Sequence, residues 1–199
     1  LITGHLTAGL RYQAKVASHR EARSLALYEF ARDLSGFLQT EQITEATQVV
    51  IQSAFRAKAI LLLPDEEGRL QLPESAASGL DMGTAPWAFD KVEAAGISTD
   101  TLPSSPYFYL PLVAPMRTRG LLAIAPENRS WILIPEQRQQ LDTFAALAAI
   151  ALERVHYIEI AQGALLHMES ERLRNSLLAA LSHDLRTPLT SIVGISEAL

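Results

Sequence analysis

The stretch between Pro135 and Pro188 contains no proline, and Gly163 is its only glycine. Pro135 in a first turn and Glu136 near the positive end of a helix dipole both favour a helix start. Apolar residues then recur at steps of three and four, the spacing of one helix face: Leu141, Phe144, Ala145, Ala148, Leu152, Val155 and Ile158. We therefore predict one helix much longer than the usual three or four turns of a globular domain.

The N-terminal part has a second helical pattern. Residues 6–38 lack proline and place apolar side chains at helical spacing, which predicts one long helix or two helices in series. Gly36 is the natural interruption. Thr40 can cap a further helix over residues 41–55, whose apolar residues lie on one side.

The segment between these helical parts has the pattern of short strands. We predict two strand pairs, at residues 57–63 with 69–72 and at residues 107–113 with 120–125, each joined by a short turn. A short helix is expected at residues 86–95, between loops. Strand pairs joined by tight turns form an antiparallel sheet with helices packed on it, so the fold class is α/β (α+β).

Helices at both ends carry apolar stripes that one small sheet cannot cover. Self-association as a parallel helical bundle would bury these stripes, and we expect a homodimer. The alternative is that both ends pack back on the sheet of their own chain.

Composition excludes several classes of function. The chain has no cysteine, which excludes disulfides, thiolate metal ligands and thioether-linked chromophores. The net charge of −5, with Lys and Arg scattered, gives no basic footprint for nucleic acid. We expect no metal site, because the histidines are far apart and lack metal-ligand spacing: His5, His19, His156, His167 and His183.

The sequence starts on Leu1 and ends inside a helical pattern, so we expect a piece of a longer protein. No apolar run reaches the roughly 18–20 residues that span a bilayer. Arg11, Lys15, Arg20 and Arg23 follow an apolar start, as the cytoplasmic flanks of membrane helices do. An ordinary surface helix with basic residues is the alternative.

The clearest chemistry lies in the segment Ser182–Pro188, where His183 stands beside Asp184 and Thr187 follows one helical turn later. A neutral imidazole can attack a phosphoryl group, and an adjacent carboxylate can fix the ring tautomer and accept its proton. The Thr187 hydroxyl can orient a water beside a phosphorylated ring, and Pro188 weakens the helix as a hinge. The alternative is a surface histidine beside an incidental aspartate.

Helix geometry separates this histidine from the apolar stripe. Leu173, Leu177, Leu181 and Leu185 step by four along one side. At about 100° per residue, His183 points nearly opposite the centre of that stripe. A histidine on that side can be reached by another domain and by a second protein.

The segment Ser182–Thr190 resembles the H-box of sensor histidine kinases, a highly specific motif. Further stretches spread over the whole chain resemble the KdpD family of these kinases, the potassium and turgor sensors: residues 1–13, 87–91, 99–103, 134–137 and 177–190.

The resemblance implies a GAF-like fold, with a central antiparallel sheet flanked by helices and a long C-terminal helix that runs into a dimerisation and phosphoacceptor helix. It implies a juxtamembrane and linker helix at residues 1–35 and a sensory domain at residues 36–160. A signalling helix with a truncated phosphoacceptor (HisKA) segment is then expected at residues 161–199.

The resemblance also implies roles for three residues: His183 as phosphoacceptor, Asp184 as its acid/base neighbour and Thr187 as a phosphatase-assisting residue. Most such kinases have Glu where this chain has Asp184. ATP with Mg, bound by a domain outside this chain, is the implied donor, and a response regulator of the KdpE type is the implied acceptor. The parent protein is expected in a bacterial inner membrane with this part in the cytoplasm. The 199 residues alone are expected to be inactive.

A small-ligand-binding GAF module without a catalytic role of its own is the alternative function. Trp87, Phe89, Tyr107 and Tyr109 are candidates to line a pocket beneath the loop at residues 73–106. The other interpretation of these aromatic side chains is that they belong to the core.

Overall fold

The computed structural model describes residues 24–65, 67–71, 79–81, 83–128 and 132–196, with side chains up to residue 182. The chain divides into two compact units, Leu1–Val155 and His156–Leu199. The helical pattern predicted for residues 6–38 is confirmed at residues 24–36, and the rest of its N-terminal part lies outside the described residues.

The helix α2, Thr40–Phe55, confirms the helix predicted at residues 41–55. It buries one side chain per turn, because residues four apart share a helix face: Ile43, Thr47, Ile51 and Phe55. The helix ends where Arg56 takes a left-handed conformation, with φ of 48°, and its N–H bonds back to the carbonyl of Gln52.

The predicted antiparallel sheet is confirmed, with four strands in the order β1-β4-β3-β2. The strands are β1 (Ala57–Leu62), β2 (Ala95–Gly96), β3 (Phe108–Val113) and β4 (Thr118–Pro126). All pairs are antiparallel. The central strand β4 is buried from Gly120 to Ile124, and Ala125 is half-buried. This burial is expected for a strand that is covered on both faces.

The hairpin predicted at residues 57–63 with 69–72 forms only in part: the described residues 69–71 form no strand, but they pair through an antiparallel bridge between Pro64 and Leu70 and a bond from the N–H of Gln71 to the carbonyl of Leu63 at 2.8 Å. The turn itself forms, since Asp65 N–H donates to the carbonyl of Arg69 at 2.8 Å. The strand β1 instead pairs along its length with β4, more than fifty positions later.

The helix predicted at residues 86–95 is shorter and earlier than expected. The helix α3 is Thr84–Lys91, and Val92 ends it in a left-handed conformation. Ala95 and Gly96 form β2 instead, opposite Tyr109 and Phe108. Gly96 has φ of +92° and lies so close to Tyr107 that a side chain does not fit, so it serves the sheet edge rather than a helix end.

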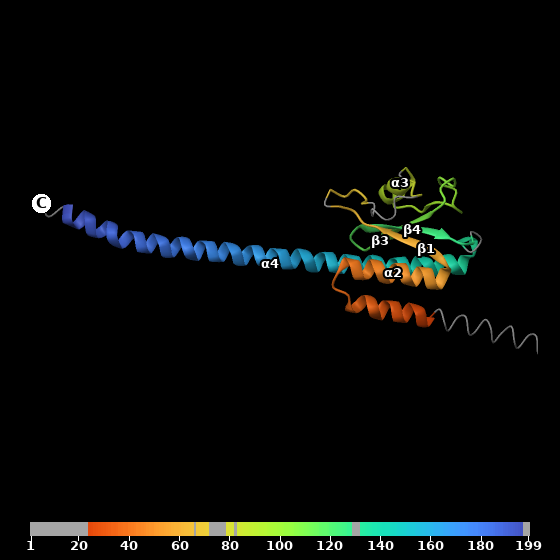
Figure 1. The fold of residues 1–199 in the computed structure, drawn as a ribbon, viewed down its shortest axis with the longest axis horizontal. Helices are drawn as coiled ribbons and strands as arrows, with labels where there is room; N and C mark the ends of the chain where they lie inside the picture. Colours follow the sequence, from red (N-terminus) through yellow and green to blue (C-terminus); the bar gives the residue numbers. More distant parts are fainter. Residues whose placement is uncertain (1–23, 66, 72–78, 82, 129–131, 197–199) are drawn as a thin grey trace, which may run out of the picture. The chain divides into compact units, whose positions relative to one another are not determined.

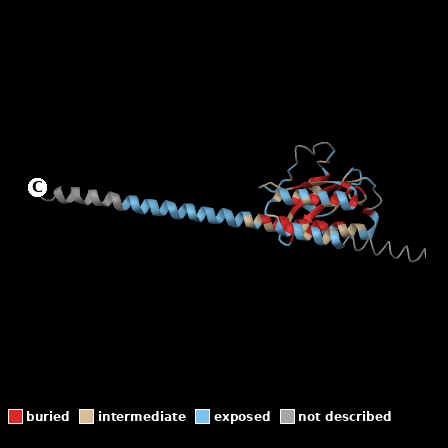
Figure 2. Ribbon diagram, turned by 60° about the horizontal axis from the view of Figure 1, so that its bottom comes forward, coloured by how far each residue is buried: buried red, intermediate tan, exposed pale blue. Residues whose placement is uncertain are grey.

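The sheet has a core on each face. The larger core lies between the sheet and the helices at residues 24–36, α2 and the start of α4, and α3 covers a smaller core on the other face (Figure 1). The Phe144 ring meets the rings of Phe30 and Phe55 edge to face at centroid distances of 5.4 and 5.9 Å. Burial is concentrated in this layered part, as Figure 2 shows.

The long C-terminal helix predicted from the sequence is confirmed as α4, Pro135–Ser196. Its side chains in the first unit alternate between buried and exposed. In the second unit every described side chain from Glu159 to Ser182 is exposed (Figure 2). Within the described residues, no helix is both long and apolar enough to cross a bilayer.

Candidate functional site

The motif around the predicted phosphoacceptor lies on α4. The backbone of residues 183–188 is helical, and α4 continues past Pro188 to Ser196. The side chains of His183, Asp184 and Thr187 lie outside the described residues, so their roles stay predictions, as does the hinge at Pro188.

The apolar stripe that precedes the motif is described as far as Leu181. Leu173, Leu177 and Leu181 are 61%, 65% and 58% exposed, and Leu185 lies outside the described side chains. Leucines this exposed at steps of four form an uncovered apolar strip along one side of the helix. The strip has the spacing of a helix–helix interface.

The four aromatic candidates gather on the α3 side of the sheet. Tyr109 is fully buried, whereas Trp87, Phe89 and Tyr107 are half-buried and pack against the smaller core. The rings of Tyr107 and Tyr109 lie 6.2 Å apart. Tyr109 is thus a core residue, and the lining of a ligand pocket by the other three stays a prediction.

A polar cluster that the sequence did not single out ties α3 to β3. The hydroxyl of Tyr109 accepts hydrogen bonds from the N–H of Asp81 at 3.0 Å and from the hydroxyl of Ser105 at 3.4 Å. The Asp81 carboxylate accepts bonds from the hydroxyl of Thr84 at 2.5 Å and from the N–H of Gly83 at 2.9 Å. These contacts fix the start of α3 over the buried tyrosine.

Hydrogen bonds to its charged form lower the pKa of the Asp81 carboxyl below its ordinary value. The Thr84 hydroxyl is the largest cause and the Gly83 N–H follows. The pairing of Asp81 with Thr84, three positions later at the first residue of α3, is a local contact. The contact with Tyr109 has no local signal, because the partners are 28 positions apart.

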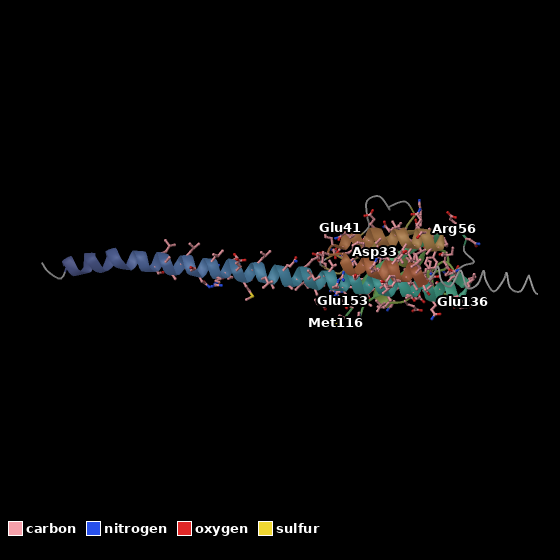
Figure 3. The ribbon with its side chains drawn as sticks, turned by 90° about the horizontal axis from the view of Figure 1, so that it is seen from below. Asp33, Glu41, Arg56, Met116, Glu136 and Glu153 are labelled. Carbon is pink, nitrogen blue, oxygen red and sulfur yellow. The ribbon has the colours of Figure 1, made fainter. Side chains whose placement is uncertain are left out.

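A buried ion pair joins α4 to the sheet. Arg119 on β4 and Glu153 on α4 lie 3.2 Å apart, with side chains only 5% and 10% exposed. The same Glu153 oxygen accepts the N–H of Met116 at 3.2 Å, and Figure 3 shows these two residues at one end of the domain. The partners are 34 positions apart in the chain, so no local sequence pattern indicates the pair.

The arrangement is a small antiparallel sheet between helices, followed by a helix that carries a histidine motif. Residues 39–154 match the GAF domain family, and the chain belongs to that family. Residues 173–199, which include the predicted phosphoacceptor, match the His Kinase A (phospho-acceptor) domain.

The chain is also a homologue of the sensor protein KdpD. It is 45% identical to KdpD of Escherichia coli (strain K12) over 202 residues, covering 100% of this chain and 22% of that protein. It is 26% identical to KdpD of Clostridium acetobutylicum over 209 residues, covering 100% of this chain and 23% of that protein. The chain thus spans between a fifth and a quarter of the length of these relatives.

The fold matches a solved structure of the same kind. The crystal structure of the native GAF domain of the potassium sensor histidine kinase KdpD from Escherichia coli aligns with a TM-score of 0.65 and 38% identity. The match covers 70% of this chain and 99% of that chain. The predicted GAF-like fold and the sensor-kinase resemblance are therefore confirmed.

Proposed function

We propose that this chain is the cytoplasmic regulatory and phosphoacceptor part of a membrane-bound sensor histidine kinase in a two-component system that controls potassium transport. The observation that carries the proposal is similarity to KdpD sensor proteins along the whole chain. The match to the phosphoacceptor domain at residues 173–199 supports it, because that segment contains His183. A KdpE-type response regulator is the proposed partner.

The proposed reaction transfers the γ-phosphoryl group of Mg-bound ATP to His183. A ring nitrogen of the neutral imidazole forms the N–P bond, the bond from the γ-phosphorus to its bridging oxygen breaks, and ADP leaves. Asp184 accepts the proton that the other ring nitrogen releases. The phosphoryl group then passes to an aspartate of the response regulator. Thr187 orients the water that hydrolyses the phosphorylated product in the phosphatase direction.

The proposed organisation places a juxtamembrane and linker helix at residues 1–35, a GAF sensory domain at residues 36–160 and the signalling and phosphoacceptor segment at residues 161–199. Two copies associate through the leucine strip on α4. This association would bury the leucine side chains of the strip, which are more than half exposed in the single chain.

Phosphotransfer can be tested by mixing the chain with the separately expressed ATP-binding domain of a KdpD kinase and labelled ATP. We expect label on the wild type, none on the variant His183→Gln, and none on the 199 residues without the second domain. His167→Gln is the matched control, because His167 is an exposed histidine on the same helix outside the motif. Label that survives His183→Gln would contradict the proposal.

A ligand-sensing role for the GAF domain is a second candidate. The observation that favours it is the set of half-buried aromatic side chains, Trp87, Phe89 and Tyr107, above the smaller core. A bound ligand would raise the melting temperature by mass action. A thermal-shift screen of metabolites and ions tests this, and Phe89→Ala should weaken any stabilisation found.

A further inference from the structure

Arg154 of α4 reaches the end of the N-terminal helix. One guanidinium nitrogen, Nη2, donates to the carbonyl oxygens of Leu34 at 2.6 Å and Phe37 at 2.8 Å. The other, Nη1, donates to the carbonyl oxygen of Ser35 at 2.9 Å. A single side chain thus holds three carbonyls that are about 120 positions away in sequence.

The carbonyls of Leu34 and Ser35 belong to the last turn of the helix at residues 24–36, and that of Phe37 directly follows it. The last four carbonyls of a helix have no intrahelical partner, and a cation there also meets the negative end of the helix dipole. At the helix end, the N–H of Phe37 bonds to the carbonyl of Leu34 at a long 3.3 Å. Arg154 therefore caps this helix from a different element.

The neighbouring residue anchors the same turn of α4 in another direction. Glu153 pairs with Arg119 and accepts the N–H of Met116, both in or next to the β3–β4 turn. Adjacent residues point about 100° apart on a helix, so the two anchors hold α4 from two sides. Asp33, Glu153 and Met116 lie at the same end of the domain in Figure 3.

The position of this turn gives it a further role. Val155, the next residue, is fully buried and is the last residue of the first unit. From Glu159 to Ser182 the described side chains of α4 are exposed. The turn at residues 153–154 thus has polar contacts with both the sheet and the N-terminal helix, directly before the boundary between the two units.

We propose that Arg154 is the coupling residue between the helix at residues 24–36 and the signalling helix, so that displacement of the N-terminal helix acts on α4 through this cap. The contacts concern the fold alone, whereas their effect on phosphorylation rests on the proposed kinase function. Glu153 fixes the same turn to Arg119 and Met116, so this turn of α4 is held from both the sheet and the N-terminal helix.

Hydrogen exchange of the 199-residue chain tests the cap without any kinase activity. Arg154→Met keeps the apolar stem and removes the donors, and we expect backbone amides at residues 28–38 to exchange about tenfold faster while those of α2 are unchanged. Arg154→Lys, which keeps the charge but not the two-pronged geometry, should give a smaller increase. Arg32→Met is the matched control, since Arg32 is exposed and pairs only locally with Asp33 in the described contacts.

The full-length kinase in proteoliposomes tests the coupling. We expect the ratio of His183 phosphorylation at low and high KCl to fall to about one in Arg154→Met and to stay at the wild-type value in Arg32→Met. Equal exchange in wild type and Arg154→Met would overturn the cap, and a wild-type KCl response in Arg154→Met would overturn the coupling. A wild type without any phosphorylation at His183 would instead count against the proposed function, and the exchange result would still decide the cap.

Discussion

Gly96 occupies a backbone position that other residues cannot adopt without strain. Its φ is +92°, and a Cβ atom built there would lie 2.0 Å from the carbonyl oxygen of Tyr107. The Gly96 N–H also bonds to the carbonyl of Thr101 at 2.8 Å, so the loop that follows is fixed to this position. We expect Gly96→Ala to lower the free energy of unfolding by about 3 kcal/mol, measured by urea unfolding followed by tryptophan fluorescence.

Gly36→Ala is the matched control for Gly96→Ala. A Cβ atom at Gly36 meets no other atom within 4 Å, and its φ is not positive. Alanine should therefore change the unfolding free energy by no more than about 0.5 kcal/mol, in the stabilising direction. Equal losses at both positions would show that the close approach to Tyr107 does not matter.

Asp81 gives the fold a pH-dependent contribution. Its pKa is lower in the folded chain than in the unfolded chain, so the stabilisation is fully present above the ordinary aspartate pKa and is lost as the pH falls through the folded value. Asp81→Asn keeps an acceptor for Gly83 and Thr84 but does not titrate. We expect the stability difference between wild type and Asp81→Asn to shrink as the pH falls from 5 to 3. A pH-independent difference in urea unfolding would contradict this.

Elements with a long periodic pattern were predictable from the sequence, and elements defined by distant partners were not. The helices α2 and α4 and the strands β3 and β4 each have enough residues for the pattern to identify them. The two-residue strand β2 exists only because Ala95 and Gly96 lie opposite β3, which no local pattern indicates. The turn predicted before residues 69–71 forms as well, but β1 pairs along its length with β4, a distant partner that no local pattern indicates.

The candidate site also combines features that a local pattern predicts with contacts between distant residues. The motif at His183 is a local sequence signal, and the family match at residues 173–199 agrees with it. The contacts of Glu153 and Arg154 join residues from 34 to 120 positions apart, so only the folded chain brings them together. Local patterns thus locate the predicted phosphoacceptor but not the contacts that hold α4 to the rest of the GAF domain.

The buried pair of Arg119 and Glu153 should stabilise the packing of α4 on the sheet. Glu153→Ala removes the carboxylate that faces a buried guanidinium and leaves the Met116 N–H without this acceptor, which should cost about 3 kcal/mol. The double variant Arg119→Met/Glu153→Ala should cost less than the sum of Arg119→Met and Glu153→Ala, since it removes both charges. Urea unfolding of the four proteins measures the coupling.

The exposed pair of Arg138 and Asp142 provides the control for this cycle. These residues are four apart on the same helix and lie 3.1 Å apart, with side chains 30% and 49% exposed. Asp142→Ala should cost less than about 1 kcal/mol, because solvent screens the pair. Additive costs at Arg119 and Glu153 would show that burial does not couple them.

At the scale of the whole molecule, the leucine strip on α4 should determine the association state. Leu177→Lys places a charge on a side chain that is 65% exposed in the single chain and buried in the proposed homodimer. Losing one buried leucine and burying an ammonium group both oppose association, so we expect the dimer dissociation constant to rise at least about tenfold. Sedimentation equilibrium over a range of chain concentrations measures this shift.

Asn175→Lys makes the same change of charge on the opposite side of the helix. Asn175 is exposed and lies two positions, or about 200°, from Leu177. We expect its dissociation constant to match that of the wild type, because the substituted side chain stays in water in both states. If both variants dissociate equally, or if the wild type is a monomer at high concentration, the strip is not the interface and α4 must have another partner.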